Sequence, residues 1–218
     1  MFVLKDLSEE NSIVNHILKE LRDKNIQQDR YRFRKNIERI GYIAAYEISK
    51  HLDYKTTQTE TPIGQATTLE LEQHPVIATV LRAGIPLQNG LNQLFNHADL
   101  AYISAFRHHT SEKEFEIKVE YLASPPLHDR DLILTDVMLA TGQSLVMTYE
   151  QFLSQGNPRN VHLVSVIGSR QGVEHVKAHI PNATLWIGCI DEELDENGYI
   201  VPGLGDAGDL SFGIKTQH

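Results

Sequence analysis

The order of apolar and polar positions divides the chain into a helical beginning, a polar hairpin and a longer alternating region. Apolar residues recur every three or four positions in residues 12–24 and 31–50, which predicts two amphipathic helices. From 55 to 71, a threonine-rich alternation is interrupted by TPIG, a pattern typical of two short strands around a turn. We therefore expect a helical N-terminal part followed by a polar hairpin.

Beyond this hairpin the chain carries five short aliphatic runs, most of them separated by helical patterns. The runs are VIATVL (76–81), LAYISA (100–105), LILT (132–135), VHLVSV (161–166) and TLWIGCI (184–190). Strands that are apolar on both faces and alternate with helices predict a parallel sheet covered on both sides. Residues 107–122 differ, because charged side chains alternate with apolar ones there, and we expect a solvent-facing hairpin or flap.

No repeat or long linker divides the 218 residues, so we expect a single α/β domain. The longest aliphatic run is far shorter than the ~20 residues that cross a bilayer, which argues against a membrane partner. The N-terminal MFVLKDLSEE lacks the pattern of a secretory signal, and one cysteine cannot form an intramolecular disulfide. These features predict a soluble, cytoplasmic protein.

The chain has a net charge of −9, which argues against nucleic acid as a partner because phosphate contacts need a basic surface. Local groups must therefore hold any anionic ligand, and LILTDVMLATGQS (132–144) offers them. Asp136 follows a strand, and TGQS (141–144) leads into a helix whose free amides can bind phosphate, with the Thr141 and Ser144 hydroxyls as further donors. The alternative is that these residues only cap the helix and form a turn.

Three other features carry less weight. GLGDAG (203–208) matches the G-x-G-x-x-G pattern, but a dinucleotide site also needs a strand before it, a helix after it and an acid ~20 residues on. The sequence does not predict this context, so we do not expect a dinucleotide-binding site. His175 and His179 lie four apart on a predicted helix without the acid of an H-E-x-x-H zinc motif. Cys189 closes an apolar strand, so we expect a core residue rather than a nucleophile.

The strand followed by Asp136, MLATG and Ser144 resembles the phosphoribosyl pyrophosphate (PRPP) motif of type I phosphoribosyltransferases. The segment DEELDENGYIVPGLGDAGD (191–209) is similar to the uracil phosphoribosyltransferase branch, as are TPIG (61–64), LRAG (81–84) and the Arg107 after a strand. The resemblance covers about 40–213. It implies the type I phosphoribosyltransferase fold, with a mostly parallel central sheet flanked by helices, a protruding β-hairpin or flap and a C-terminal base-binding hood.

The resemblance also implies an activity, a domain plan and an assembly. The reaction would be uracil plus PRPP giving UMP plus pyrophosphate, in pyrimidine salvage, by a homo-oligomer (dimer or tetramer). Residues 1–218 would form one phosphoribosyltransferase domain with a helical N-terminal part (about 1–50), a PRPP-binding core (about 75–190) and a base-binding tail (about 191–218).

The same resemblance implies two sets of site residues and one metal. PRPP would be bound by Arg82, Arg107, Asp136, Met138, Leu139, Ala140, Thr141, Gly142, Gln143, Ser144 and Asp206, with Asp136 and Asp206 as the catalytic carboxylates. Uracil would be bound by Tyr199, Ile200, Gly205, Asp206 and Ala207. Mg²⁺ would bind with PRPP and would meet Asp206 indirectly, through PRPP and water.

Four positions depart from the uracil branch. Val137 stands where that branch typically has proline, so one carboxylate remains at this strand end, as in the branch. Gln143 stands in place of glycine, His108 in place of an acid or asparagine, and Leu210 in place of an arginine near the site. Two alternatives stay open: another nucleobase phosphoribosyltransferase, or a non-catalytic regulator that senses PRPP or UMP.

Overall fold

The computed structural model describes residues 1–109 and 115–215, and the side chains of all of these except 105–109 and 115–119. The helices are α1 (Ile13–Arg22), α2 (Arg30–Ser49), α3 (Ile85–Leu94), α4 (Gln143–Phe152), α5 (Arg170–His179) and α6 (Ala207–Phe212), with 3-10 turns η1 (Ile26–Gln28) and η2 (Leu153–Gln155). None of the helices described is long and apolar enough to cross a membrane.

The strands form one large sheet and two small hairpins. The large sheet has the order β1-β10-β9-β7-β4-β5-β6, with the short β8 paired to β9. Its strands are β1 (Val3–Asp6), β4 (Val76–Val80), β5 (Asp99–His109), β6 (Phe115–Ala123), β7 (Asp131–Thr135), β8 (Met138–Leu139), β9 (Asn160–Ser169) and β10 (Thr184–Asp191). Only the β5–β6 pairing among these is antiparallel. The small hairpins are β2 (Tyr54–Thr61) with β3 (Gly64–Leu71), and β11 (Glu193–Leu194) with β12 (Ile200–Val201).

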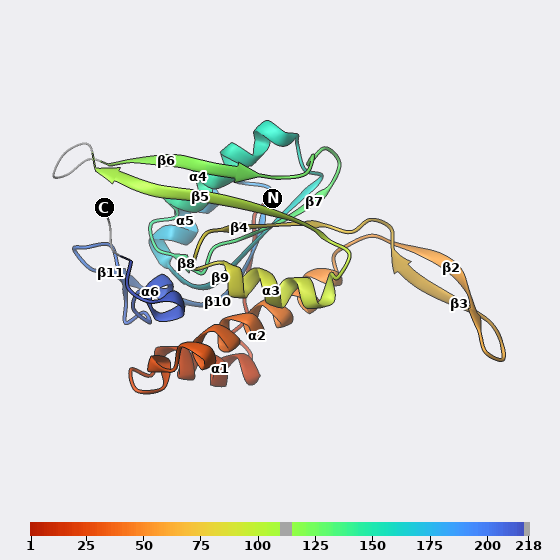
Figure 1. Ribbon diagram of the computed structural model, residues 1–218, viewed down its shortest axis with the longest axis horizontal. Helices are drawn as coiled ribbons and strands as arrows, with labels where there is room; N and C mark the ends of the chain where they lie inside the picture. Colours follow the sequence, from red (N-terminus) through yellow and green to blue (C-terminus); the bar gives the residue numbers. More distant parts are fainter. Residues whose placement is uncertain (110–114, 216–218) are drawn as a thin grey trace.

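Helices cover both faces of the large sheet (Figure 1). On one face, α1, α2 and α3 pack on side chains that include Ile77 and Ile133. On the other face, α4 and α5 pack on the neighbouring positions, such as Ala78 and Leu132. Successive strand residues therefore enter opposite cores, which explains why these strands are apolar without alternation.

The structure confirms the predicted order of elements and adds several short ones that the hydrophobic pattern does not predict. All five aliphatic runs are strands, and 107–122 falls in the β5–β6 hairpin rather than in a crossover helix. The unpredicted elements include β1, which pairs with β10 at the sheet edge, and α6, which lies in the glycine-rich tail. Both are short, with four and six residues, so neither spans enough positions for a periodic signal.

Two glycines bring α2 and α3 into close contact. A Cβ atom on Gly41 would collide with the Leu87 carbonyl oxygen, and one on Gly90 would collide with the Glu38 carbonyl oxygen. Since α3 begins three residues after Arg82, this packing also anchors the segment that leads out of β4. The helix pair therefore fixes one end of the segment that carries Arg82.

Replacing Gly90 with alanine should lower the free energy of unfolding by about 1–3 kcal/mol, because the added methyl group overpacks this contact. Gly64→Ala is the matched control, since a Cβ there would meet no heavy atom within 4 Å, and it should change stability by less than about 0.5 kcal/mol. Urea unfolding followed by circular dichroism measures both variants. Equal stabilities would show that α2 and α3 tolerate a wider separation.

Candidate active site

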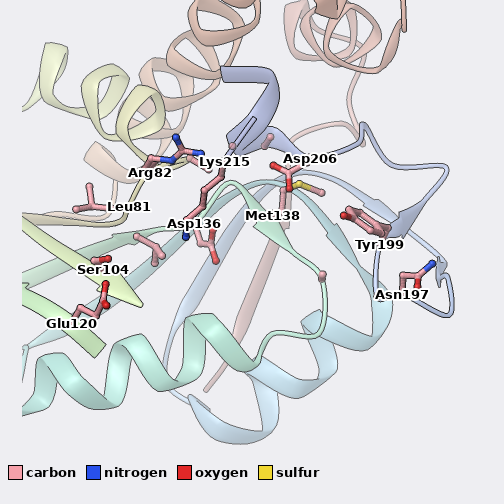
Figure 2. Close-up of a pocket in the computed structure, with 16 residues that line it drawn as sticks. Leu81, Arg82, Ser104, Glu120, Asp136, Met138, Asn197, Tyr199, Asp206 and Lys215 are labelled. Atoms are coloured by element: carbon pink, nitrogen blue, oxygen red, sulfur yellow. The ribbon is translucent and has the colours of Figure 1, made fainter. Parts of the chain in front are cut away.

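A cavity of about 660 Å³ opens at the carboxyl ends of the parallel strands (Figure 2). Its walls come from the segments that follow β4 and β7, from β5 and β6, and from the tail after β10. The predicted site residues that line it are Arg82, Asp136, Met138, Ala140, Tyr199, Asp206 and Ala207. Residues predicted from three distant parts of the sequence therefore surround one cavity.

Most of the other predicted site residues lie outside this lining. They are Leu139, Thr141, Gly142, Gln143, Ser144, Ile200 and Gly205. Leu139 and Ile200 bury their side chains in the core, so only their backbone groups can face a ligand. Arg107 pairs with Ile117 in the β5–β6 ladder, and its side chain lies outside the described residues.

The N-terminus of α4 has the features of an anion site. Gly142 occupies the N-cap position with φ 79° and provides no side-chain cap, so the first amides of α4 lack a strong partner within the helix. The Gln143 N–H donates to Thr141 Oγ1 over 3.5 Å, which is long for a hydrogen bond. The interpretation of Thr141 and Ser144 as ordinary helix caps is therefore not supported, and free amides remain for a ligand.

Gly142 also faces inward. A Cβ atom there would lie 2.8 Å from the Gly172 carbonyl oxygen and 3.3 Å from the His175 side chain, both in α5. The glycine thus allows both the left-handed backbone and the close packing of this loop on α5. Any larger side chain at this position would disturb this packing.

Asp136 and Val137 face in opposite directions at the end of β7. The Asp136 N–H donates to the Val164 carbonyl oxygen at 3.1 Å, and the carboxylate belongs to the cavity lining. Val137 is fully buried in the core beneath the N-terminal helices. A carboxylate at position 137 would have to be buried among apolar side chains, which explains the single acid at this strand end.

The tail meets the segment after β4 at the cavity. Asp206 caps α6 by accepting a hydrogen bond from the Asp209 N–H at 2.9 Å, so it begins a short helix rather than lying in a loop. Arg82 lies 3.8 Å from the Asp209 carboxylate. The side chain of Ala207 is buried, as is that of Ile200, and these two anchor the tail to the core.

Several lining residues have no signal in the sequence. Ser104 and Glu120 come from β5 and β6, and Lys215 follows the last motif, where its N–H donates to the Asp209 carboxylate at 3.2 Å. Their position depends on tertiary packing, which no local pattern reports. Leu210 packs against the core under the N-terminal helices, so an apolar contact accounts for the missing cation at that position.

The remaining candidates stand apart from the cavity. Cys189 is buried in the core, as predicted, and burial raises the pKa of its thiol to about 11, so the reactive thiolate is scarce at neutral pH. His175 and His179 stack on α5 with ring centroids 4.1 Å apart. No group of three or more possible metal ligands occurs in the described part of the chain.

Known proteins are similar to this chain in both sequence and fold. The family model for uracil phosphoribosyltransferase matches residues 8–214. A uracil phosphoribosyltransferase of Porphyromonas gingivalis is 45% identical over 210 residues, which cover 96% of this chain and 97% of the relative.

Solved structures agree with this match. The AQ2163 protein from Aquifex aeolicus superposes with a TM-score of 0.86 at 26% identity, over 99% of this chain and 100% of the other. A hypoxanthine phosphoribosyltransferase from Staphylococcus aureus, 13% identical, superposes with a TM-score of 0.51 over 85% and 84% of the two chains and shares the fold alone. From its sequence match and its mostly parallel, helix-covered sheet, the chain belongs to the uracil phosphoribosyltransferase family and has the type I phosphoribosyltransferase fold.

Proposed function

We propose that this enzyme transfers the 5-phosphoribosyl group of PRPP to uracil, giving UMP and pyrophosphate in pyrimidine salvage. The observation that carries the proposal is the single cavity that joins Arg82, Asp136 and the tail. The family membership of the chain supports the same activity. Residues in or beside this cavity can bind each part of the two substrates, PRPP and uracil.

The 5-phosphate of PRPP binds at the start of α4. The backbone from Met138 to Ser144 wraps around it, and the amides at the helix N-terminus donate to its oxygens. The Thr141 and Ser144 side chains are only partly buried, so their hydroxyls can add further donors. These local groups offset the overall negative charge of the chain.

The pyrophosphate leaving group binds to Arg82 and Arg107. A guanidinium can donate two parallel hydrogen bonds to pyrophosphate oxygens and remains charged throughout the reaction. Arg82 is about half exposed and pairs with Asp209 only at 3.8 Å, so it is able to turn towards a stronger anionic partner. By neutralising the leaving group, the two arginines lower the barrier to its departure.

Asp136 and Asp206 act on the ribose. Departure of pyrophosphate leaves positive charge on C1 and the ring oxygen, and carboxylates on the cavity wall stabilise that charge in the transition state. Asp136 reaches the ribose from the end of β7, while Asp206 reaches it from the start of α6. Uracil N1 bonds to C1 as the bond from C1 to pyrophosphate breaks, and the N1 proton passes to the departing pyrophosphate or to water.

Magnesium is the cofactor of this reaction, bound together with PRPP. The donor set fits such a metal, because Asp136, Asp206 and Glu120 line the cavity, whereas the described residues form no metal cage of their own. Mg²⁺ seldom uses all-protein ligands and keeps several waters and substrate oxygens. When bound, the ion would offset the negative charge of the pyrophosphate, and Asp206 would help to hold it indirectly, through PRPP and water.

The tail reads the base through its backbone. Tyr199 lies beside the ribose, while backbone groups of Ile200, Gly205 and Ala207 pair with the polar edge of uracil. The buried side chains of Ile200 and Ala207 support this role, because they hold the backbone in place without competing for the base. Backbone donors and acceptors cannot exchange roles, so this arrangement fixes the choice of base.

Residues 1–218 act as one domain in which the core of about 75–190 binds PRPP and the tail of about 191–218 binds the base. The enzyme is a cytoplasmic homo-oligomer, a dimer or a tetramer. It needs neither nucleic acid nor a membrane as a partner, in keeping with its acidic composition.

Thr141→Asp should weaken PRPP binding by tenfold or more, because a carboxylate would repel the phosphate at the start of α4. Thr141→Ser, which keeps the hydroxyl, should bind PRPP nearly as tightly as the wild type. Titration calorimetry with PRPP and magnesium measures both affinities, and thermal unfolding confirms that the variants fold. Unchanged affinity in a folded Thr141→Asp variant would place the phosphate elsewhere.

Base choice tests the activity itself. If tail amides face uracil O4 and a carbonyl faces its N3–H, cytosine presents two mismatches that each cost ~1–3 kcal/mol. We expect uracil to be preferred over cytosine by about 30-fold to 10⁴-fold in kcat/KM. Release of pyrophosphate with PRPP, magnesium and each base measures this ratio, and hypoxanthine is the purine control. Equal rates with another base would contradict the tail as the uracil reader, and no turnover with any base would contradict the proposed activity.

A further inference from the structure

A partly buried ion pair connects the first helix to the tail. Arg22, the last residue of α1, donates from Nη1 to Asp191 Oδ2 at 2.8 Å and from Nη2 to Asp191 Oδ1 at 2.7 Å. This two-point geometry is the strongest that a guanidinium and a carboxylate can adopt. Asp191 is the last residue of β10, so the pair joins two elements that are 169 residues apart in sequence.

The same pair also holds the backbone of Gly203 from both sides. The Gly203 N–H donates to Asp191 Oδ2 at 2.9 Å, and the Gly203 carbonyl oxygen accepts from Arg22 Nη1 at 3.0 Å. We call these three residues the Arg22–Asp191–Gly203 clamp. Since both polar groups of Gly203 are bound, this point of the tail cannot rotate or shift without breaking charged hydrogen bonds.

The surroundings of the clamp make it costly to break. The side chain of Asp191 is 8% exposed and that of Arg22 25% exposed, so either charge left alone would be poorly hydrated. Burial by itself would raise the pKa of Asp191, but the hydrogen bonds from Arg22 and Gly203 hold it below its usual value. The carboxylate therefore stays ionised at neutral pH and keeps both partners.

The clamp lies between the backbone positions proposed to read uracil. Gly203 follows Ile200 by three residues and precedes Gly205 by two, whereas none of the three clamp residues lines the cavity. Gln27, in η1, lies close to the same loop, since its Oε1 is 3.9 Å from the position that a Cβ atom on Gly205 would take. Residues of α1 and η1 thus support the proposed base-reading loop from the side that faces away from the cavity lining.

We propose that Arg22 and Asp191 are positioning residues that set the affinity for uracil by fixing the tail backbone at Gly203. The inference rests on the proposed role of the tail and names side chains, one from α1 and one from β10, that control it without touching the base. A shift of about 1 Å in a binding group can cost as much as a hundredfold. Loss of the clamp should therefore raise the KM for uracil and leave the distant phosphate site unaffected.

The test uses two conservative variants and one matched control. Asp191→Asn keeps the shape of the side chain but removes the charge, and Arg22→Lys keeps the charge but cannot donate to Asp191 twice and to Gly203 as well. The control is Glu192→Gln, which breaks the neighbouring exposed pair with Arg170 (2.7 Å) and leaves Gly203 untouched. All three are assayed with uracil, PRPP and magnesium, with thermal unfolding as a check of folding.

Both clamp variants should raise the KM for uracil by on the order of tenfold to a hundredfold, with less than about a twofold change in the KM for PRPP. Glu192→Gln should match the wild type in both constants. Amide hydrogen exchange followed by mass spectrometry should be faster at residues 199–206 in the clamp variants and unchanged around 141–144. Because hydrogen exchange does not require turnover, it also tests the clamp in a variant that has lost activity.

The outcomes separate this inference from the proposed function. A wild-type protein that does not convert uracil contradicts the proposed function, whatever the variants do. A wild-type protein that converts uracil, with folded clamp variants whose KM for uracil matches the control, overturns the clamp. The clamp is also overturned when the KM for PRPP rises as much as that for uracil, or when exchange at 199–206 does not change.

Discussion

The site depends on one constraint, which is that the parallel strands of a sheet covered on both faces end at the same edge. β4 and β7 are direct neighbours, with Val76 opposite Leu132 and Thr79 opposite Thr135. The residues that follow them, Arg82 and Asp136, must therefore leave the sheet side by side. Because helices bury both faces, the strand ends are the place where the chain can form a polar cavity.

The electrostatics of the molecule follow from that geometry. With 29 acidic and 20 basic residues, the protein as a whole repels an anion as highly charged as PRPP. The proposed binding therefore relies on groups whose direction is fixed, namely the first amides of α4 and the guanidinium of Arg82. The proposal treats the base in the same way: the tail would meet it with backbone groups that are held in place by buried side chains and by the Arg22–Asp191 pair.

The sequence predicts the parts of the structure that have a local cause. The short apolar runs predict the five strands, which the structure confirms, whereas the burial of Val137 next to Asp136 becomes visible only in the fold. The pattern does not predict β1 or α6, which are too short for a periodic signal.

Other features depend on contacts between distant segments. The β5–β6 hairpin brings Glu120 to the cavity, and the fold of the tail brings Lys215 there. No sequence motif around either residue predicts this position. The clamp is of the same kind, since Arg22 is an ordinary helix end until the fold brings it to Asp191. The local pattern thus predicts the elements and the proposed phosphate loop, whereas the contacts that support the tail need the tertiary structure.

The central claim is that one cavity holds the phosphate at the start of α4 and the base at the tail. A crystal structure of the protein with the product UMP tests it most directly, because UMP carries both groups at a fixed separation. Our account predicts the phosphate within hydrogen-bonding distance of the amides of residues 141–144, the ribose beside Asp136, and the uracil edge on the backbone between Ile200 and Ala207. A phosphate bound away from α4, or a base that makes no contact with the tail, would contradict it.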